Sequence, residues 1–128
     1  MQVKEERAEV ILEDFKKHVN KRKKDGSEIL NSLTPEKCDM LHMAVGTSTE
    51  ANELLDAFKK HVIYGKELDV VNVREELGDL LFYMQGIANI LDIDMLDILK
   101  ENIDKLEVRY PDGYTDKNAI ARLDKVND

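Results

Sequence analysis

The sequence predicts an all-α protein, folded as a bundle of helices. Apolar residues recur at spacings of three and four over long stretches, which is the period of an amphipathic helix. No segment shows the alternation of apolar and polar residues that is typical of a strand. Aromatic residues make up only 5% and Trp is absent, so the core must be mostly aliphatic, which suits packed helices. At 128 residues, we expect a single domain over 1–128.

The first helix is expected over residues 3–23. Its apolar side chains are Val10, Ile11, Phe15 and Val19. Lysines at its end complement the negative pole of the helix dipole, and the Asp-Gly pair at 25–26 is a stop signal. Residues 26–33 form a polar segment with no predicted helix.

The second helix is expected from Thr34, as N-cap, and Pro35, at the first helical position, to about residue 64. Its inward face is predicted to carry Leu41, Val45, Leu54, Leu55, Phe58 and Val62. The sequence Gly-Thr-Ser-Thr at 46–49 is a poor helix former, so a bend or break is expected there.

Two further helices are expected over residues 70–91 and 95–109, capped by Asp69 and Asp94. The first carries a sustained apolar stripe: Val73, Leu77, Leu80, Leu81, Met84, Ile87, Ala88 and Leu91. The second would place inward Met95, Ile98, Leu99, Ile103 and Leu106. A polar tail with one or two helical turns follows the turn at 110–113.

Composition and charge exclude several functional classes. The net charge of −8 opposes binding to nucleic acid, because phosphate contacts need clustered Lys and Arg. No apolar run reaches the roughly 20 residues that span a bilayer, so we expect no membrane association. The single cysteine, Cys38, cannot form an internal disulfide, and we expect a cytoplasmic location.

Two pairs of acidic residues are the strongest candidates for chemistry. Glu50 and Glu53 lie three residues apart on the second helix, as Glu76 and Asp79 do on the third. This spacing puts both carboxylates of a pair on one helix face. If the helices pack antiparallel, the pairs converge, and the mutual repulsion favours a bound cation. Carboxylate oxygens suit Mg²⁺, with Mn²⁺ as an alternative.

A second interpretation stays open at this point. Acidic pairs at this spacing are also common on solvated helix faces, and 27 of the 128 residues are acidic. Lys59, Lys60 and Arg74 could form ordinary surface ion pairs with them.

The order of the motifs resembles the MazG-like all-α nucleoside triphosphate pyrophosphohydrolases. The resemblance covers about residues 41–113, with a motif-bearing core taken as 34–113. The matching segments are LHMAVGTSTEANEL at 41–54, KKH at 59–61, YGK at 64–66, EELGDLL at 75–81, NIDK at 102–105 and RYP at 109–111. It implies a four-helix bundle, here with an extra N-terminal helix, assembled as a homodimer or homotetramer.

The resemblance also implies an activity and a set of residues. A nucleoside or deoxynucleoside triphosphate would be hydrolysed to the monophosphate and pyrophosphate, as nucleotide-pool house-cleaning. The Mg²⁺ ligands would be Glu50, Glu53, Glu76 and Asp79. Asn102, Lys105 and Arg109 would share a face of the last helix and contact the sugar or phosphates.

One position departs from the family pattern. An additional Glu often precedes the first metal-binding Glu, and here Thr49 stands in its place. The number of metal ions and the identity of the base are therefore open. A cluster carboxylate, Glu53 or Glu50, could orient the attacking water instead.

Two aromatic residues have two interpretations each. His42 could reach the nucleobase, or could be an ordinary interface histidine. Tyr83 lies one turn after Asp79 and could contact the substrate, or could pack in a helix interface with its hydroxyl at the edge.

Two functions therefore compete. The first is the Mg²⁺-dependent pyrophosphohydrolase. The second is a non-catalytic helical bundle that acts by binding partners, which the missing carboxylate at Thr49 and the charged first helix motivate.

Overall fold

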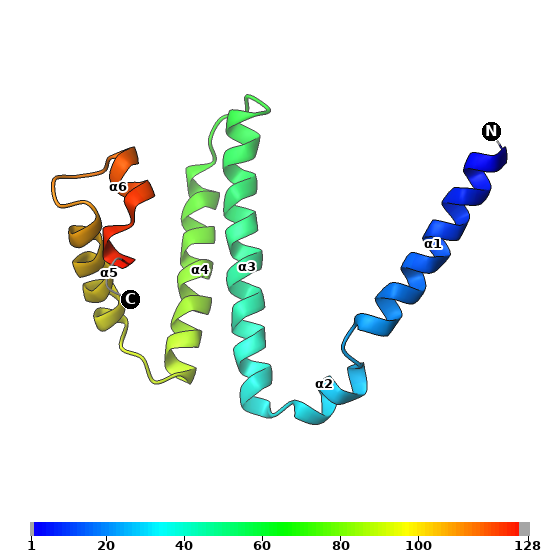
Figure 1. Cartoon of the computed structure of the whole chain (residues 1–128). Coiled ribbons are helices and arrows are strands. Elements are labelled where there is room, and N and C mark those ends of the chain that lie inside the picture. The colour runs from blue at the N-terminus through cyan, green and yellow to red at the C-terminus, as the bar shows by residue number, and fades with distance from the viewer. Residues whose placement is uncertain (1, 126–128) are drawn as a thin grey trace. The chain divides into compact units, whose positions relative to one another are not determined.

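The computed structural model describes residues 2–125, and side chains from residue 6 onward (Figure 1). Every regular element among residues 2–125 is helical, which confirms the all-α prediction. The helices are α1 (Gln2–Arg22), α2 (Gly26–Ser32), α3 (Pro35–Val62), α4 (Val70–Ile90), α5 (Met95–Arg109), α6 (Asp116–Ala121) and the 3₁₀ helix η1 (Leu123–Lys125). Within the described part of the chain, none is both long and apolar enough to cross a membrane.

The chain divides into two compact units, Met1–Pro35 and Glu36–Asp128. The second unit begins close to residue 34, where the sequence motifs predict the start of the functional core. The single domain over 1–128 stays a prediction.

The first unit consists of α1 and α2. The extra N-terminal helix is confirmed as α1, whereas α2 replaces the segment for which no helix was predicted. Asp25 explains the difference, because its Oδ1 accepts a hydrogen bond from the Ser27 backbone N–H at 2.7 Å. The residue that signals the end of one helix therefore caps the start of the next.

Helix α3 runs without a break through residues 46–49, so the prediction of a break there is wrong. Two hydroxyl groups turn back onto the helix itself. Thr47 Oγ1 donates to the Met43 carbonyl at 2.9 Å, and Thr49 Oγ1 donates to the Gly46 carbonyl at 3.0 Å. These bonds satisfy the hydroxyls locally and leave the backbone helical.

A short, well-defined turn connects α3 to the antiparallel helix α4 (Figure 1). Gly65 supplies the positive φ of 65° that the chain needs after α3 ends. His61 Nδ1 donates to the Lys66 carbonyl at 2.7 Å, which ties α3 to the turn. Asp69 caps α4 as predicted, accepting from the Asn72 backbone N–H at 3.0 Å.

The two helices meet along small residues. The Tyr83 ring lies against Gly46, and the Met43 side chain lies against Gly86, which fixes the antiparallel register. Ala57 on α3 is also buried, with 7% of its surface exposed. This line of contact, from Met43 and Gly86 at one end to Ala57 at the other, is called the seam below.

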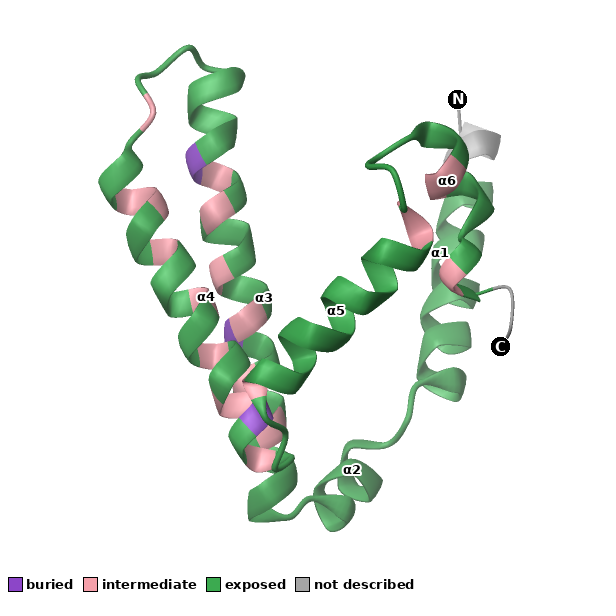
Figure 2. Ribbon diagram, turned by 90° about the vertical axis from the view of Figure 1, so that its left-hand side faces the viewer, coloured by how far each residue is buried: buried purple, intermediate pink, exposed green. Residues whose placement is uncertain are grey.

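The seam is not the apolar face predicted for α3. Five of the six residues expected inward are exposed: Leu41, Val45, Leu55, Phe58 and Val62. Intermediate and buried residues instead follow the facing sides of α3 and α4 (Figure 2). The exposed aliphatic residues of α3 lie off this line of contact, whereas Leu54 on α3 and Leu80 and Ile87 on α4 are half-buried.

Half of the stripe predicted on α4 and most of its counterpart on α5 are also exposed. The exposed members are Leu77, Leu81 and Met84 on α4, Leu91 at its C-cap, and Ile98, Leu99, Ile103 and Leu106 on α5. Apolar surface of this extent usually belongs to an interface.

Helix α5 is capped by Asp94 as predicted, through a 2.8 Å bond from the Leu96 backbone N–H. The expected turns after residue 113 are α6 and η1.

Arg109, at the end of α5, forms a bidentate ion pair with Asp124 in η1. Its Nε donates to Oδ1 at 2.6 Å and its Nη2 to Oδ2 at 2.7 Å. This ion pair joins two residues that are 15 positions apart in the sequence of the second unit.

We expect Gly46→Ala to destabilise the protein by about 1–3 kcal/mol, because a Cβ there would overlap the Tyr83 ring and force it to move. Gly78→Ala is the matched control: no atom lies within 4 Å of its added Cβ. Gly78 lies inside α4, so its replacement should instead stabilise the helix by about 1 kcal/mol. Denaturant unfolding at one protein concentration measures the change in unfolding free energy for both variants. Equal changes would contradict the close packing of Tyr83 on Gly46.

The second prediction concerns pH. The two hydrogen bonds from Arg109 lower the pKa of Asp124 from 3.8 to about 2. A carboxyl group with a lowered pKa stabilises the fold fully above its unfolded pKa and loses this contribution as pH falls. The difference in unfolding free energy between wild type and Asp124→Asn should therefore be constant above about pH 4 and shrink between pH 4 and 2. A difference independent of pH would contradict the pairing.

Candidate metal centre

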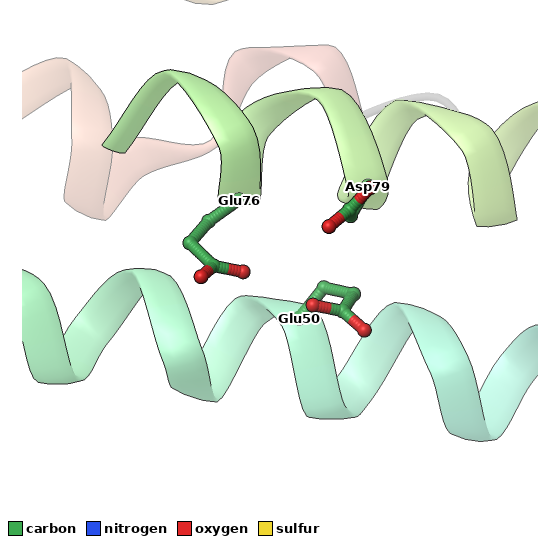
Figure 3. A group of neighbouring side chains, drawn as sticks. All are labelled: Glu50, Glu76 and Asp79. Atoms are coloured by element: carbon green, nitrogen blue, oxygen red, sulfur yellow. The ribbon is translucent and has the colours of Figure 1, made fainter. Parts of the chain in front are cut away.

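Three carboxylates from α3 and α4 converge at the middle of the seam (Figure 3). One ligand oxygen from each of Glu50, Glu76 and Asp79 lies within 4.8 Å of the others. Figure 3 shows Glu76 and Asp79 directed from α4 toward α3, where Glu50 lies. The predicted convergence of the two acidic pairs is therefore present for these three residues.

Glu53, the fourth predicted ligand, lies beside this group rather than within it. Its side chain is on an exposed position of α3, yet its charge acts on Glu76. Burial raises the pKa of Glu76, and the neighbouring carboxylates of Glu50, Glu53 and Asp79 raise it further. The four acidic residues thus form one electrostatic cluster.

The donor set of this cluster fits a hard divalent cation. It offers oxygen ligands only, as Mg²⁺ and Mn²⁺ prefer, and no His or Cys belongs to the group. Glu50 and Glu76 are partly buried, so their repulsion is less screened by water than on an open surface. A cation between them would remove this repulsion, and Glu50, Glu76 and Asp79 would hold it.

Thr49, the position at which the sequence was expected to depart from the family pattern, has a local role in α3. Its hydroxyl donates to the Gly46 carbonyl at 3.0 Å, within the turn of α3 that packs on Tyr83. This hydroxyl therefore supports the helix next to Glu50.

His42 and Tyr83 come together at one end of the seam. Their rings are 6.2 Å apart between centroids in an edge-to-face arrangement. Tyr83 also lies against Gly46, one helical turn from Glu50. Tyr83 therefore packs in the helix interface, about one helical turn from Asp79 along α4, whereas His42 is more than two turns from Glu50 along α3.

The other end of the seam carries cationic, acidic and amide side chains. A hollow of about 370 Å³ is lined by Ala57, Lys60, Lys66, Glu67, Asp69 and Asn72. Lys60 is held by Asp56, with 2.6 Å between Nζ and Oδ2. The hollow begins one helical turn from Glu53, so hydrogen-bond donors lie next to the acidic cluster.

The predicted substrate residues of α5 have divergent environments. Asn102 and Lys105 line one hollow of about 250 Å³, together with Ile98 and Glu101. Arg109, in contrast, is engaged by Asp124, and the two side chains are only 17% and 3% exposed. Sequence reasoning missed Asp124, because nothing in a polar tail indicates which acidic residue meets a particular Arg.

Comparison with known proteins agrees with the all-α fold. Residues 38–114 match the family model described as the MazG nucleotide pyrophosphohydrolase domain. This match covers more than half of the chain, including the seam, the cluster and all of α5. No curated protein and no solved structure was found to match the chain. The chain belongs to the MazG nucleotide pyrophosphohydrolase family.

Proposed function

We propose that this protein is a Mg²⁺-dependent pyrophosphohydrolase that converts a nucleoside or deoxynucleoside triphosphate to the monophosphate and pyrophosphate. The observation that carries the proposal is the group formed by Glu50, Glu76 and Asp79 across the seam. Such activity would clear non-standard triphosphates or adjust the deoxynucleotide pool.

The chemistry needs both charge compensation and an oriented water. When bound, Mg²⁺ would neutralise phosphate oxygens and lower the pKa of a coordinated water. The water oxygen would form a bond to a phosphorus atom of the α–β anhydride linkage, as the bond from that phosphorus to the bridging oxygen breaks. Glu53 is the best candidate to accept the water's proton, because its carboxylate lies beside the three ligands and is exposed. Glu50 is the alternative base, from within the ligand group.

Substrate contacts outside the cluster are assigned to four side chains, and Arg109 is given an indirect role. Asn102 and Lys105 would contact sugar and phosphate, since they share one hollow on α5. His42 and Tyr83, whose rings meet edge to face at one end of the seam, would contact the base end of the nucleotide. Arg109 would act through its ion pair with Asp124.

A second candidate is a non-catalytic interaction module, and the exposed apolar stripes favour it. It predicts no Mg²⁺-dependent binding of nucleotide in a calorimetric titration. The convergence of three carboxylates, two of them partly buried, weighs against it, because their mutual repulsion destabilises a bundle that binds no cation.

We propose a second copy of the same chain, in a homodimer or homotetramer, as the cover of the exposed stripes. Leu55 on α3 is 63% exposed and Leu81 on α4 is 59% exposed, although both lie on amphipathic helices. A further hollow of about 330 Å³ is entirely apolar and lined by Leu55, Phe58, Lys59, Val62 and Ile63. Self-association would bury this surface without removing polar groups from water.

We also propose a cytoplasmic location. The thiol of Cys38 is free and exposed, which suits a reducing compartment better than an oxidising one.

We expect Glu76→Gln to reduce metal-dependent pyrophosphate release more than about 100-fold, because it removes a ligand from the centre of the cluster. Glu75→Gln, one residue away and outside the cluster, changes the net charge equally and should retain activity. The assay measures pyrophosphate release from standard and modified triphosphates, with Mg²⁺, Mn²⁺ or EDTA. Equal activity of the two variants would overturn the proposed site.

We expect Leu81→Glu to dissociate the assembly, because it buries a charge in the proposed interface. Asn89→Glu adds the same charge to α4 on the side away from the apolar stripe and should leave the assembly intact. Light scattering after size-exclusion chromatography measures the molar mass. A monomeric wild type would contradict the proposal.

A further inference from the structure

The ion pair between Arg109 and Asp124 connects the matched family domain to a segment outside it. Arg109 lies within residues 38–114, whereas Asp124 lies beyond them, in η1. Both carboxylate oxygens accept from the guanidinium, at 2.6 and 2.7 Å. With side chains 17% and 3% exposed, the pair is largely shielded from water.

Arg109 cannot easily leave this carboxylate for a phosphate group. Bidentate, charge-assisted hydrogen bonds of this kind are among the strongest between side chains. Removing the guanidinium would leave the Asp124 charge shielded from water and without a partner, which is strongly unfavourable. The paired guanidinium also presents little net charge to an incoming anion.

Lys105, one helical turn before Arg109, has the opposite environment. It has no ion-pair partner among the described residues, and it borders two hollows. One is the hollow shared with Asn102. The other, of about 360 Å³, is lined by Asp104, Lys105, Val108, Leu123 and Asp124. Helix α5 forms one wall of this second hollow and η1 forms the other, so the ion pair sets the distance between the walls.

We infer that Asp124 is a positioning residue for the substrate site: through Arg109, it fixes η1 against α5 as the wall of the hollow in which Lys105 contacts a phosphate group. This inference rests on the proposed function. Of the two cationic residues on α5 that the family resemblance implies as phosphate contacts, it keeps Lys105 and gives Arg109 a structural role. It also makes residues 115–125 part of the site.

The test compares two variants that remove the ion pair in different ways. Asp124→Asn leaves Arg109 without its charge partner, so η1 should loosen and KM for the triphosphate should rise about tenfold, with kcat changed less. The double variant Arg109→Met, Asp124→Leu replaces the pair by apolar side chains of similar volume, which buried sites often tolerate. It should restore the wall, and with it a KM within about threefold of wild type.

A structural readout accompanies the kinetics. Hydrogen exchange of residues 115–125 should accelerate in Asp124→Asn and remain slow in the double variant. A lower KM in Asp124→Asn would overturn the inference, because it would mean that the released Arg109 binds phosphate. A double variant as impaired as the single one would also overturn it, because the charge of Arg109 would then be what matters.

The test separates this inference from the proposed function. If wild type hydrolyses no triphosphate, the proposed activity fails, and calorimetric titration of inorganic triphosphate with Mg²⁺ replaces KM. Weaker binding by Asp124→Asn, restored in the double variant, supports the positioning role without catalysis. Equal binding by all three proteins, or binding by none, overturns it.

Discussion

The close approach of α3 and α4 is the constraint on which the candidate site depends. Carboxylates on separate helices can share a cation only if the helix axes are near, and Gly46 permits this by accepting the Tyr83 ring on its backbone. With the register set in this way, Glu50 meets Glu76 and Asp79. The packing of the seam opposes the repulsion among the carboxylates, so the helices support an arrangement that the acidic residues alone would disfavour.

The same constraint explains the unusual distribution of apolar residues. At the seam, glycines receive the Tyr83 ring and the Met43 side chain, and most of the aliphatic side chains predicted inward on α3 stay exposed within one chain. In the proposed homo-oligomer a second copy would cover these stripes, and the stability of the fold would then depend on protein concentration.

Sequence reasoning identified what depends on local patterns. Helix periodicity and the capping aspartates Asp69 and Asp94 predicted α4 and α5 well, and the acidic pairs predicted the cluster. It placed the wrong face of α3 inward, because hydrophobicity shows that a face avoids water but not which surface covers it. Asp124 was missed for a related reason: a contact between residues distant along the chain leaves no periodic signal.

The short turn between α3 and α4 has a consequence for how the chain folds. All three carboxylates of the group belong to one helical hairpin, whose turn is pinned by His61 and Asp69. Hairpins with a short loop close quickly, since little chain entropy is lost in bringing their ends together. The ligands can therefore meet early, while distant segments are still unplaced, and a cation present at that moment would favour the correct register over slipped alternatives.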